Sequence, residues 1–539
     1  MNKFACTFVV AVLLATTWCS IGCSSSSKHA QEDIESINQA FAEKAYEYFI
    51  ELSAIPRGSG NMLAISDYLT AFGRERGLLT IQDEALNVFI KKTGSVGRGG
   101  EAPIILQGHM DMVCQKNSGI DHDFLRDPIV PWIDGDWIKA HGTTLGADNG
   151  GGLAIILAVL DSDNLSHPPI EVVITTDEET TMNGALSFDT SLLSGNRIIN
   201  LDEEDEGIFV VSCAGGASAG ITIPIQTLAM PNGLVTYELN VKGLIGGHSG
   251  VDINSGRANA NLLIARLINA IANSGIFVAS IDGGTARNAI TRECTAVLSF
   301  PEGSYEAIQA VISAEEATIK SEFPIEIGLM VTWTKTSDAQ TAINPDSLQR
   351  VLDCILGLPN GMLAMSPDIA GLVQTSSNLG IIETGSNEVM LTCMPRSSVP
   401  AELAETIETM KNLAELLGGK LDISDAFPAW PYKANSPLRD ALIDFYKGLY
   451  GVDPMLGATH GGLECGVFAE KMPHADIISI GPTVFDAHSP DERMSLSSFN
   501  RTCGFVIEIL KKLPGNPTPK SSGVVTIIPE VYQGKYQRL

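Results

Sequence analysis

The residues best suited to chemistry are histidines and carboxylates in glycine-rich or turn-like contexts. The chain has only nine histidines among 539 residues, so a histidine in such a context stands out. Histidine nitrogen and carboxylate oxygen are the ligands that Zn²⁺ and harder cations accept. Hydrolysis with two metal ions also needs a bridging carboxylate and a free base for the attacking water. The candidates are His109-Met110-Asp111, Asp148-Asn149, Asp177-Glu178-Glu179, Asp202 and His488.

Several candidates follow short apolar runs that are typical of buried strands. The runs are residues 103–106, 170–176 and 197–201. Each fragment alone has an ordinary explanation, since H-x-D arises by chance and an aspartate before glycines is often a helix cap. Taken together they favour one site, because ligand sites of α/β sheets lie at the carboxyl ends of the strands.

The elements that must position these residues predict an α/β fold. Residues 33–54 have the apolar spacing of an amphipathic helix, and residues 152–160 predict another helix. Strands that alternate with helices predict a mostly parallel sheet with helices on both faces.

The pattern changes after about residue 217. Residues 235–241 alternate between apolar and polar, as in a half-exposed strand, and a helix follows near residues 257–273. Because the motif character of the first part returns near residue 425, we expect an inserted α+β domain. The expected division is 1–22 signal peptide, 23–32 polar tether, 33–216 main domain, 217–425 inserted domain, 426–513 remainder of the main domain, and 514–539 an unassigned tail.

Composition limits the partners. A net charge of −28 repels phosphate backbones, so nucleic acid is excluded as a partner, while the acidic residues suit cations or simply keep the protein soluble. Seven cysteines follow residue 23, and no two form a C-x-x-C pair. This argues against a disulfide framework and against a thiolate zinc site.

The first residues are typical of a targeting segment. Lys3 precedes an apolar run at residues 8–15 that is too short to span a bilayer in the ordinary way. Ser20-Ile21-Gly22-Cys23 resembles the cleavage site of a bacterial lipoprotein. We therefore expect an exported protein, anchored to a periplasmic or outer membrane face through a lipid on Cys23. The alternative is an ordinary secretory signal in which Cys23 has no role.

Ten ordered motifs carry a family resemblance that covers about residues 33–512. They are SAIPRGSG (53–60), GHMDMVCQKN (108–117), GTTLGADNGGGLA (142–154), TTDEET (175–180), NLDEEDEG (200–207), KGLIGGHSGVDI (242–253), GGTARNAITRE (283–293), TSSNLG (375–380), HGGLECG (460–466) and GPTVFDAHSPDE (481–492). The chain resembles the aminoacyl-histidine dipeptidases, also called Xaa-His or cytosol non-specific dipeptidases. They belong to the zinc superfamily that includes carnosinases and acylamino-acid deacylases. Ala258 and Thr291 depart from the family pattern, and neither removes an expected ligand.

The resemblance implies a ligand set for two Zn²⁺ ions, although Mn²⁺ or Co²⁺ would also suit the donors. It assigns His109 and Asp202 to one ion, Glu179 and His488 to the other, and Asp148 to a bridge between them.

The resemblance also implies catalytic roles. Glu178 is the expected general base, and Asp111 is expected to orient or polarise the site. His248, in the inserted or lid domain, is expected to stabilise the oxyanion; a histidine at an ordinary turn is the alternative.

Four further residues are expected to bind substrate: Asn288, Arg396, His460 and Glu464. A guanidinium such as that of Arg396 suits a terminal carboxylate because its donors match two oxygens. The expected activity is metal-dependent hydrolysis of dipeptides, of Xaa-His type or of broad specificity, by a monomer or a homodimer. Two alternatives stay open: an N-acyl-amino-acid deacylase and a non-catalytic binding lipoprotein.

Overall fold

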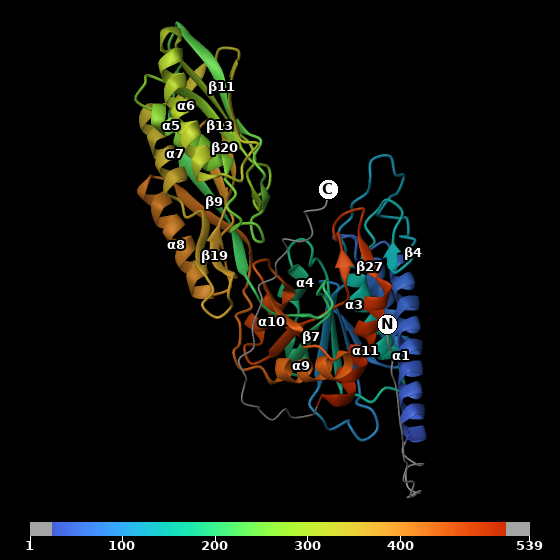
Figure 1. Ribbon diagram of the computed structural model, residues 1–539. Coiled ribbons are helices and arrows are strands. Elements are labelled where there is room, and N and C mark those ends of the chain that lie inside the picture. Colours follow the sequence, from blue (N-terminus) through green and yellow to red (C-terminus); the bar gives the residue numbers. More distant parts are fainter. Residues whose placement is uncertain (1–23, 514–539) are drawn as a thin grey trace, which may run out of the picture.

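The computed structural model describes residues 24–513, which form two domains (Figure 1). The expected signal peptide, Cys23 and the tail after residue 513 lie outside the described residues. Residues 24–32, expected as a tether, are helical and continuous with the first long helix. Within the described range, none of the helices has the length and apolar character needed to cross a bilayer.

The main domain is built on a mixed sheet with a parallel centre. Neighbouring strands lie in the order β1-β2-β6-β3-β7-β25-β8-β24, and β3 is parallel to both β6 and β7. The bounds are β1 Leu79–Gln82, β2 Val88–Lys92, β3 Ile104–His109, β6 Ile170–Thr175, β7 Arg197–Asn200, β8 Ile208–Cys213, β24 Met455–Thr459 and β25 Asp476–Ser479.

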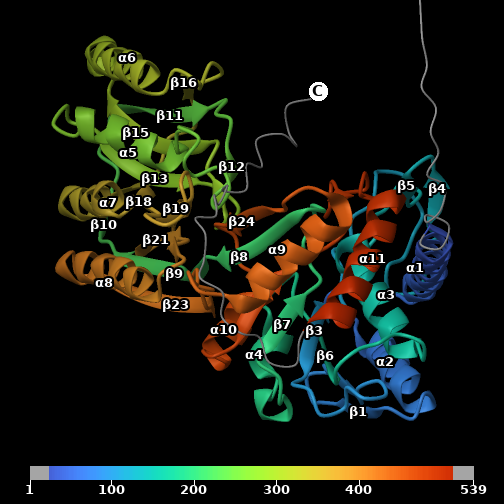
Figure 2. The ribbon, with the colours of Figure 1, turned by 60° about the horizontal axis from the view of Figure 1, so that its bottom comes forward.

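Helices cover both faces of this sheet (Figures 1 and 2). Alternate residues of each strand point to opposite faces, so Ile104 and Leu106 pack in one core and Ile105 in another. The first core includes α1, α2, α3, α9 and α11, and the second includes α4 and α10. Their bounds are α1 Ser24–Ser53, α2 Leu63–Glu75, α3 Ala147–Asp161, α4 Asn183–Ser187, α9 Pro437–Tyr450, α10 Glu464–Lys471 and α11 Leu496–Lys512, with the 3₁₀ turn η1 Thr190–Leu192. The predicted α/β class is confirmed.

The lid domain is an antiparallel sheet with helices packed against one face. Its strands follow the order β16-β11-β15-β13-β20-β21-β9-β22-β19-β18, and β23 also pairs with β9. The strand bounds are β9 Gly215–Pro224, β11 Leu234–Lys242, β13 Phe277–Gly283, β15 Cys294–Pro301, β16 Met330–Lys335, β18 Gly361–Met365, β19 Val373–Ser377, β20 Leu379–Thr384, β21 Glu388–Cys393, β22 Arg396–Ser397 and β23 Lys420–Phe427. The helical elements are α5 Ala260–Ile271, α6 Tyr305–Glu322, α7 Pro345–Gly357, α8 Pro400–Leu416 and the 3₁₀ turn η2 Glu302–Ser304.

Three small sheets complete the fold. Strands β26 and β27 flank the loop that carries His488, and they continue into β5 and β4. The remaining pairs are β12 with β14, and β10 with β17. The bounds are β4 Trp132–Asp134, β5 Trp137–Lys139, β10 Thr227–Ala229, β12 Gly247–His248, β14 Ala289–Ile290, β17 Thr341–Ile343, β26 Val484–Phe485 and β27 Arg493–Ser495.

Two adjacent crossings join the domains. The chain enters the lid through β9 and returns through β23, which is antiparallel to β9. Just outside the lid sheet, Cys213 and Trp430 exchange two backbone hydrogen bonds of 3.1 Å. Insertion and return therefore lie side by side, and the main-domain sheet takes strands from both sides of the insertion.

Candidate metal centre and active site

His109, the last residue of β3, lies between three carboxylates. Its Nε2 is 3.2 Å from Asp148 Oδ1 and 3.1 Å from Asp202 Oδ1. Its Nδ1 is 3.4 Å from Asp111 Oδ1 and 3.2 Å from the Asp111 carbonyl oxygen. A proton on Nδ1 can be donated to Asp111, which leaves the Nε2 lone pair directed at the other two carboxylates.

Asp148 joins His109 to a second cluster. Its Oδ2 is 3.1 Å from Nε2 of His488, and that nitrogen is 2.9 Å from Glu179 Oε2. Among the described residues, possible ligand atoms form three triads, and Asp148 belongs to two of them, one with His109 and Asp202 and one with Glu179 and His488. Within each triad these atoms lie within 4.8 Å of one another.

The donor set fits divalent cations. Oε1 of Glu179 and Oδ1 of Asp202 are buried and receive no hydrogen bond from the residues described. Burial raises the pKa of Glu179 to about 7, with a further contribution from the charge of Asp148. Burial likewise raises the pKa of Asp202 to about 6. Crowded, buried carboxylates with free lone pairs need compensating positive charge, and two metal ions would supply it.

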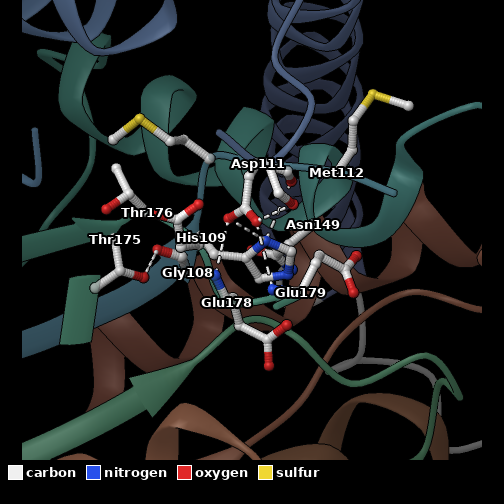
Figure 3. Close-up of polar contacts among 12 residues, drawn as sticks. Gly108, His109, Asp111, Met112, Asn149, Thr175, Thr176, Glu178 and Glu179 are labelled. Carbon is white, nitrogen blue, oxygen red and sulfur yellow. Dashed lines mark hydrogen bonds and ion pairs between the residues drawn. The ribbon is translucent and has the colours of Figure 1, made fainter. Parts of the chain in front are cut away.

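Asp111 holds the turn that carries Glu178 and Glu179. Its Oδ1 accepts the backbone N–H of Glu178 at 3.1 Å, and its Oδ2 accepts that of Glu179 at 3.3 Å (Figure 3). The Ser59 hydroxyl donates to Oδ2 at 2.8 Å. Because Asp111 also faces His109, one carboxylate fixes both the imidazole and the neighbouring turn.

Glu178 lies beside the ligand cluster without belonging to the triads that contain Asp148. Its carboxylate comes within 4.8 Å of ligand atoms of His109 and Glu179. Burial raises the pKa of Glu178 well above the usual value, the charge of His109 lowers it, and the charge of Glu179 raises it. A carboxylate with a raised pKa beside the ligands is suited to take up a proton and release it again.

Backbone conformation at the site departs from the common regions. His488 has φ of +63° and Asp177 has φ of +55°, in the left-handed region that residues other than glycine seldom adopt. Such conformations persist where the surrounding structure fixes them, and they cluster at functional sites.

The amide of Asn149 and two glycines bring α3 close to the strands that end at the site. Asn149 Nδ2 donates to the Leu201 carbonyl oxygen at 2.5 Å, directly before Asp202. A Cβ at Gly152 would lie 2.1 Å from the same oxygen, and one at Gly108 would lie 2.3 Å from Asn149 Oδ1. The glycines of both motifs therefore permit a backbone approach that side chains would prevent.

The lid histidine, His248, presents one defined tautomer. Its Nδ1 accepts the backbone N–H groups of Gly250 and Val251, each at 3.3 Å, so the proton of the neutral ring lies on Nε2. Burial lowers the pKa of His248 to about 4, and the charge of Arg396 lowers it further. Among the described residues, His248 forms neither a hydrogen bond nor an ion pair with the five candidate ligands.

Arg396 and His460 lie where the lid meets the main domain. Arg396 is 4 % exposed, and its Nε has no hydrogen-bond partner in the described part of the chain. His460 Nε2 lies 2.7 Å from the Ser376 hydroxyl of the lid. Burial lowers the pKa of His460 to about 3, and the charges of Arg396 and His248 add to this effect. Arg396 supplies the positive charge of this region, and the two neutral histidines lie near it, so the region suits an anionic group.

Two other predicted residues have different surroundings. Glu464 is fully buried, and its Oε2 accepts hydrogen bonds of 2.6 Å from Gln107 and Thr175, so it lies beneath the strand ends. Asn288 is exposed, and its carbonyl oxygen accepts the Ser249 backbone N–H at 2.8 Å. Asn288 therefore contacts the segment that follows His248.

Comparison with known proteins assigns the family. The model for peptidase family M20/M25/M40 matches residues 105–512, a span that includes every candidate ligand. The chain belongs to this peptidase family. It is therefore a peptide-bond hydrolase, as the sequence motifs predicted.

Individual relatives agree with this family assignment. The chain is 34% identical over 480 residues to the cytosol non-specific dipeptidase of Escherichia coli K12, which covers 89% of this chain and 99% of the relative. It is 36% identical to the aminoacylhistidine dipeptidase of Vibrio alginolyticus, with a TM-score of 0.80 and coverage of 89% and 97%. Aminopeptidase PepT of Bacillus cereus shares the fold at 16% identity and a TM-score of 0.50, with coverage of 87% and 98%. The family resemblance read from the motifs is confirmed.

The expected location is wrong. The Escherichia coli relative that matches nearly its full length is described as a cytosolic enzyme, which contradicts export and lipid anchoring through Cys23. The expectation came from a short apolar run and a cysteine preceded by a small residue. Such a pattern is brief enough to arise without a targeting role.

Proposed function

We propose that this M20-family dipeptidase uses two zinc ions held by the five clustered side chains. His109 and Asp202 would hold one ion, Glu179 and His488 the other, and Asp148 would bridge them. The observation that carries the proposal is the shared position of Asp148, whose two oxygens face two different histidines at 3.2 and 3.1 Å. When bound, such ions lower the pKa of water and polarise a carbonyl group.

Glu178 acts as the general base. It lies beside the ligand cluster without belonging to the triads that share Asp148, and burial has raised its pKa. Its carboxylate removes a proton from the attacking water and then donates that proton to the leaving amine. Asp111 supports this step because it fixes the Glu178 backbone and the His109 ring together.

Arg396, with His460 near it, binds the carboxylate end of the substrate. Arg396 is buried, its Nε has no hydrogen-bond partner among the described residues, and a guanidinium forms paired hydrogen bonds with a carboxylate. His248 carries its proton on Nε2, and this N–H can donate a hydrogen bond to the oxygen that becomes negative in the transition state. Asn288 borders the His248 segment, whereas Glu464 supports the strand ends from below.

A panel of substrates tests the proposal. The purified protein is stripped of metal, reloaded with Zn²⁺, and assayed on Xaa-His dipeptides, other dipeptides, tripeptides and N-acyl amino acids, beside Glu178→Ala. We expect zinc-dependent cleavage of dipeptides that the substitution abolishes, and the ratio between Xaa-His and other dipeptides defines specificity. Cleavage of N-acyl amino acids alone would identify a deacylase, and no turnover with metal bound would contradict catalysis.

A further inference from the structure

Glu492 is a buried carboxylate that holds the turn carrying Asp148. It is 3 % exposed, and its two oxygens accept four consecutive backbone N–H groups. Oε2 accepts those of Leu145 and Gly146 at 2.7 and 2.9 Å, and Oε1 accepts those of Ala147 and Asp148 at 2.7 and 3.3 Å. Hydrogen bonds to a charged acceptor are about twice as strong as neutral ones, so this carboxylate fixes the turn firmly.

Arg57 holds the same turn from another direction. Its Nη2 donates to the Gly146 carbonyl oxygen, and its Nη1 donates to the carbonyl oxygens of Met110 and Asp111 at 3.0 and 3.1 Å. The guanidinium is 1 % exposed. It therefore connects the segment after His109 to the turn before Asp148.

The glycines of this stretch make room for the guanidinium. Gly146 has φ of +71°, and a Cβ there would lie 2.6 Å from Arg57 Nη2. A Cβ at Gly150 would lie at the same distance from that nitrogen. Neither position tolerates a side chain while Arg57 stays in place.

We propose that Glu492 and Arg57 are positioning residues that set the geometry of the bridging carboxylate, and with it the affinity for both metal ions. Glu492 lies in the same loop as His488, four residues further along, and its carboxylate holds the backbone of Asp148 itself. Arg57 links that turn to the segment that follows His109. Three segments that carry proposed ligands are thus held together by two buried side chains that lie outside the proposed ligand set. This inference rests on the proposed metal centre.

Glu492→Gln tests the proposal with almost no change of shape. The amide NH₂ cannot accept hydrogen bonds, so one pair of backbone N–H groups loses its acceptor. Loss of a residue that supports metal ligands weakens metal affinity about 10- to 100-fold. We expect a loss of this size for at least one Zn²⁺ site, measured by competition with a chromophoric chelator. At limiting zinc kcat should fall and recover as zinc is raised, with KM for a dipeptide unchanged.

Glu171→Gln is the matched control. Glu171 is also fully buried and accepts two backbone N–H groups, those of Ser194 and Gly195, each at 2.9 Å. It lies in β6 next to Ile170, at the end of the strand opposite to the metal centre. Glu171→Gln should lower the melting temperature and leave zinc affinity unchanged, because loss of these hydrogen bonds destabilises the fold without moving the proposed ligands.

Arg57→Lys provides a second test if Glu492→Gln does not fold. A single ammonium nitrogen cannot occupy both guanidinium positions, so zinc affinity should fall again. A wild-type chain that fails to bind two Zn²⁺ would contradict the metal centre itself. A wild-type chain with two Zn²⁺, together with a folded Glu492→Gln or Arg57→Lys variant of unchanged affinity, would overturn only the positioning role.

Discussion

Asp111→Asn probes how strongly one carboxylate organises the site. The substitution keeps the size of the side chain and replaces one oxygen by an NH₂ group. If that group replaces Oδ1, it faces the Glu178 N–H and His109. If it replaces Oδ2, it faces the Glu179 N–H and Ser59, whose hydroxyl can rotate to accept. The second arrangement costs less, and it leaves one backbone N–H without an acceptor.

The cost follows from these contacts. An unsatisfied buried N–H costs about 2 kcal/mol, and loss of the negative charge weakens the remaining hydrogen bonds by about 1 kcal/mol in total. The arrangement in which Glu178 and Glu179 face the ligand cluster is then less stable by about 3 kcal/mol. Since 1.36 kcal/mol corresponds to a factor of ten in rate, kcat/KM should fall roughly 10²-fold.

The assay measures kcat and KM on a dipeptide at saturating zinc, with the metal content of each sample. Asp476→Asn is the matched control, because Asp476 accepts a serine hydroxyl and a backbone N–H at the start of α9, far along β25 from the site. The control should keep kcat/KM within about twofold by the same reasoning. An Asp111→Asn variant with full metal and less than about a threefold loss would refute this account of the site.

Three further predictions concern the base, the metals and a buried histidine. Glu178→Gln should lower kcat by about 10²- to 10⁴-fold with metal content unchanged, as measured by steady-state kinetics and elemental analysis; a smaller loss would assign the proton transfer to another group. Chelation should abolish activity and lower the melting temperature, and added Zn²⁺ should restore both. A melting temperature that does not change with zinc would contradict a metal site that forms only in the folded state. The pKa of His460 is lowered to about 3 by burial, whereas the unfolded chain takes up this proton near pH 6.5. The free energy of unfolding therefore falls as the pH drops below 6.5, by up to about 2 kcal/mol at about pH 5. His460→Gln should reduce the difference between the free energies of unfolding measured with urea at about pH 7.5 and about pH 5.

The sequence predicted best the strands whose ends carry the candidate site residues. A buried apolar run has a clear pattern, and the strand ending at His109 forms as residues 103–106 indicated. Asp111 lies two residues after His109, and side chains at this spacing on an extended segment face the same way; His109 Nδ1 and Asp111 Oδ1 are 3.4 Å apart. The proposed bridging role of Asp148 came from a family resemblance, because nothing in an Asp-Asn-Gly sequence distinguishes a bridging carboxylate from a helix cap.

Residues that act through backbone groups escaped sequence analysis. Arg57 and Glu492 lie within the quoted motifs SAIPRGSG and GPTVFDAHSPDE, yet they were not singled out. Their partners are carbonyl oxygens and N–H groups, which every residue carries, so spacing in the sequence contains no sign of the contact. Their role becomes visible only in the structure, where the arginine and the glutamate are both buried beside glycine-rich turns. Glu464 was expected at the substrate, and its sequence context gave no sign of its burial or of its hydrogen bonds from Gln107 and Thr175.

The strand order of the main-domain sheet has a consequence for synthesis of the chain. β25 lies between β7 and β8, although the ribosome makes β7 and β8 in succession and β25 only after the whole lid. A nascent chain that ends before β25 has a gap at the centre of its sheet, and it also lacks His488. All strands and helices of the lid, between β9 and β23, are made before β25, so the lid can fold before the main-domain sheet is complete. Until β25 has been made, such a chain exposes unpaired strand edges, which are prone to aggregation.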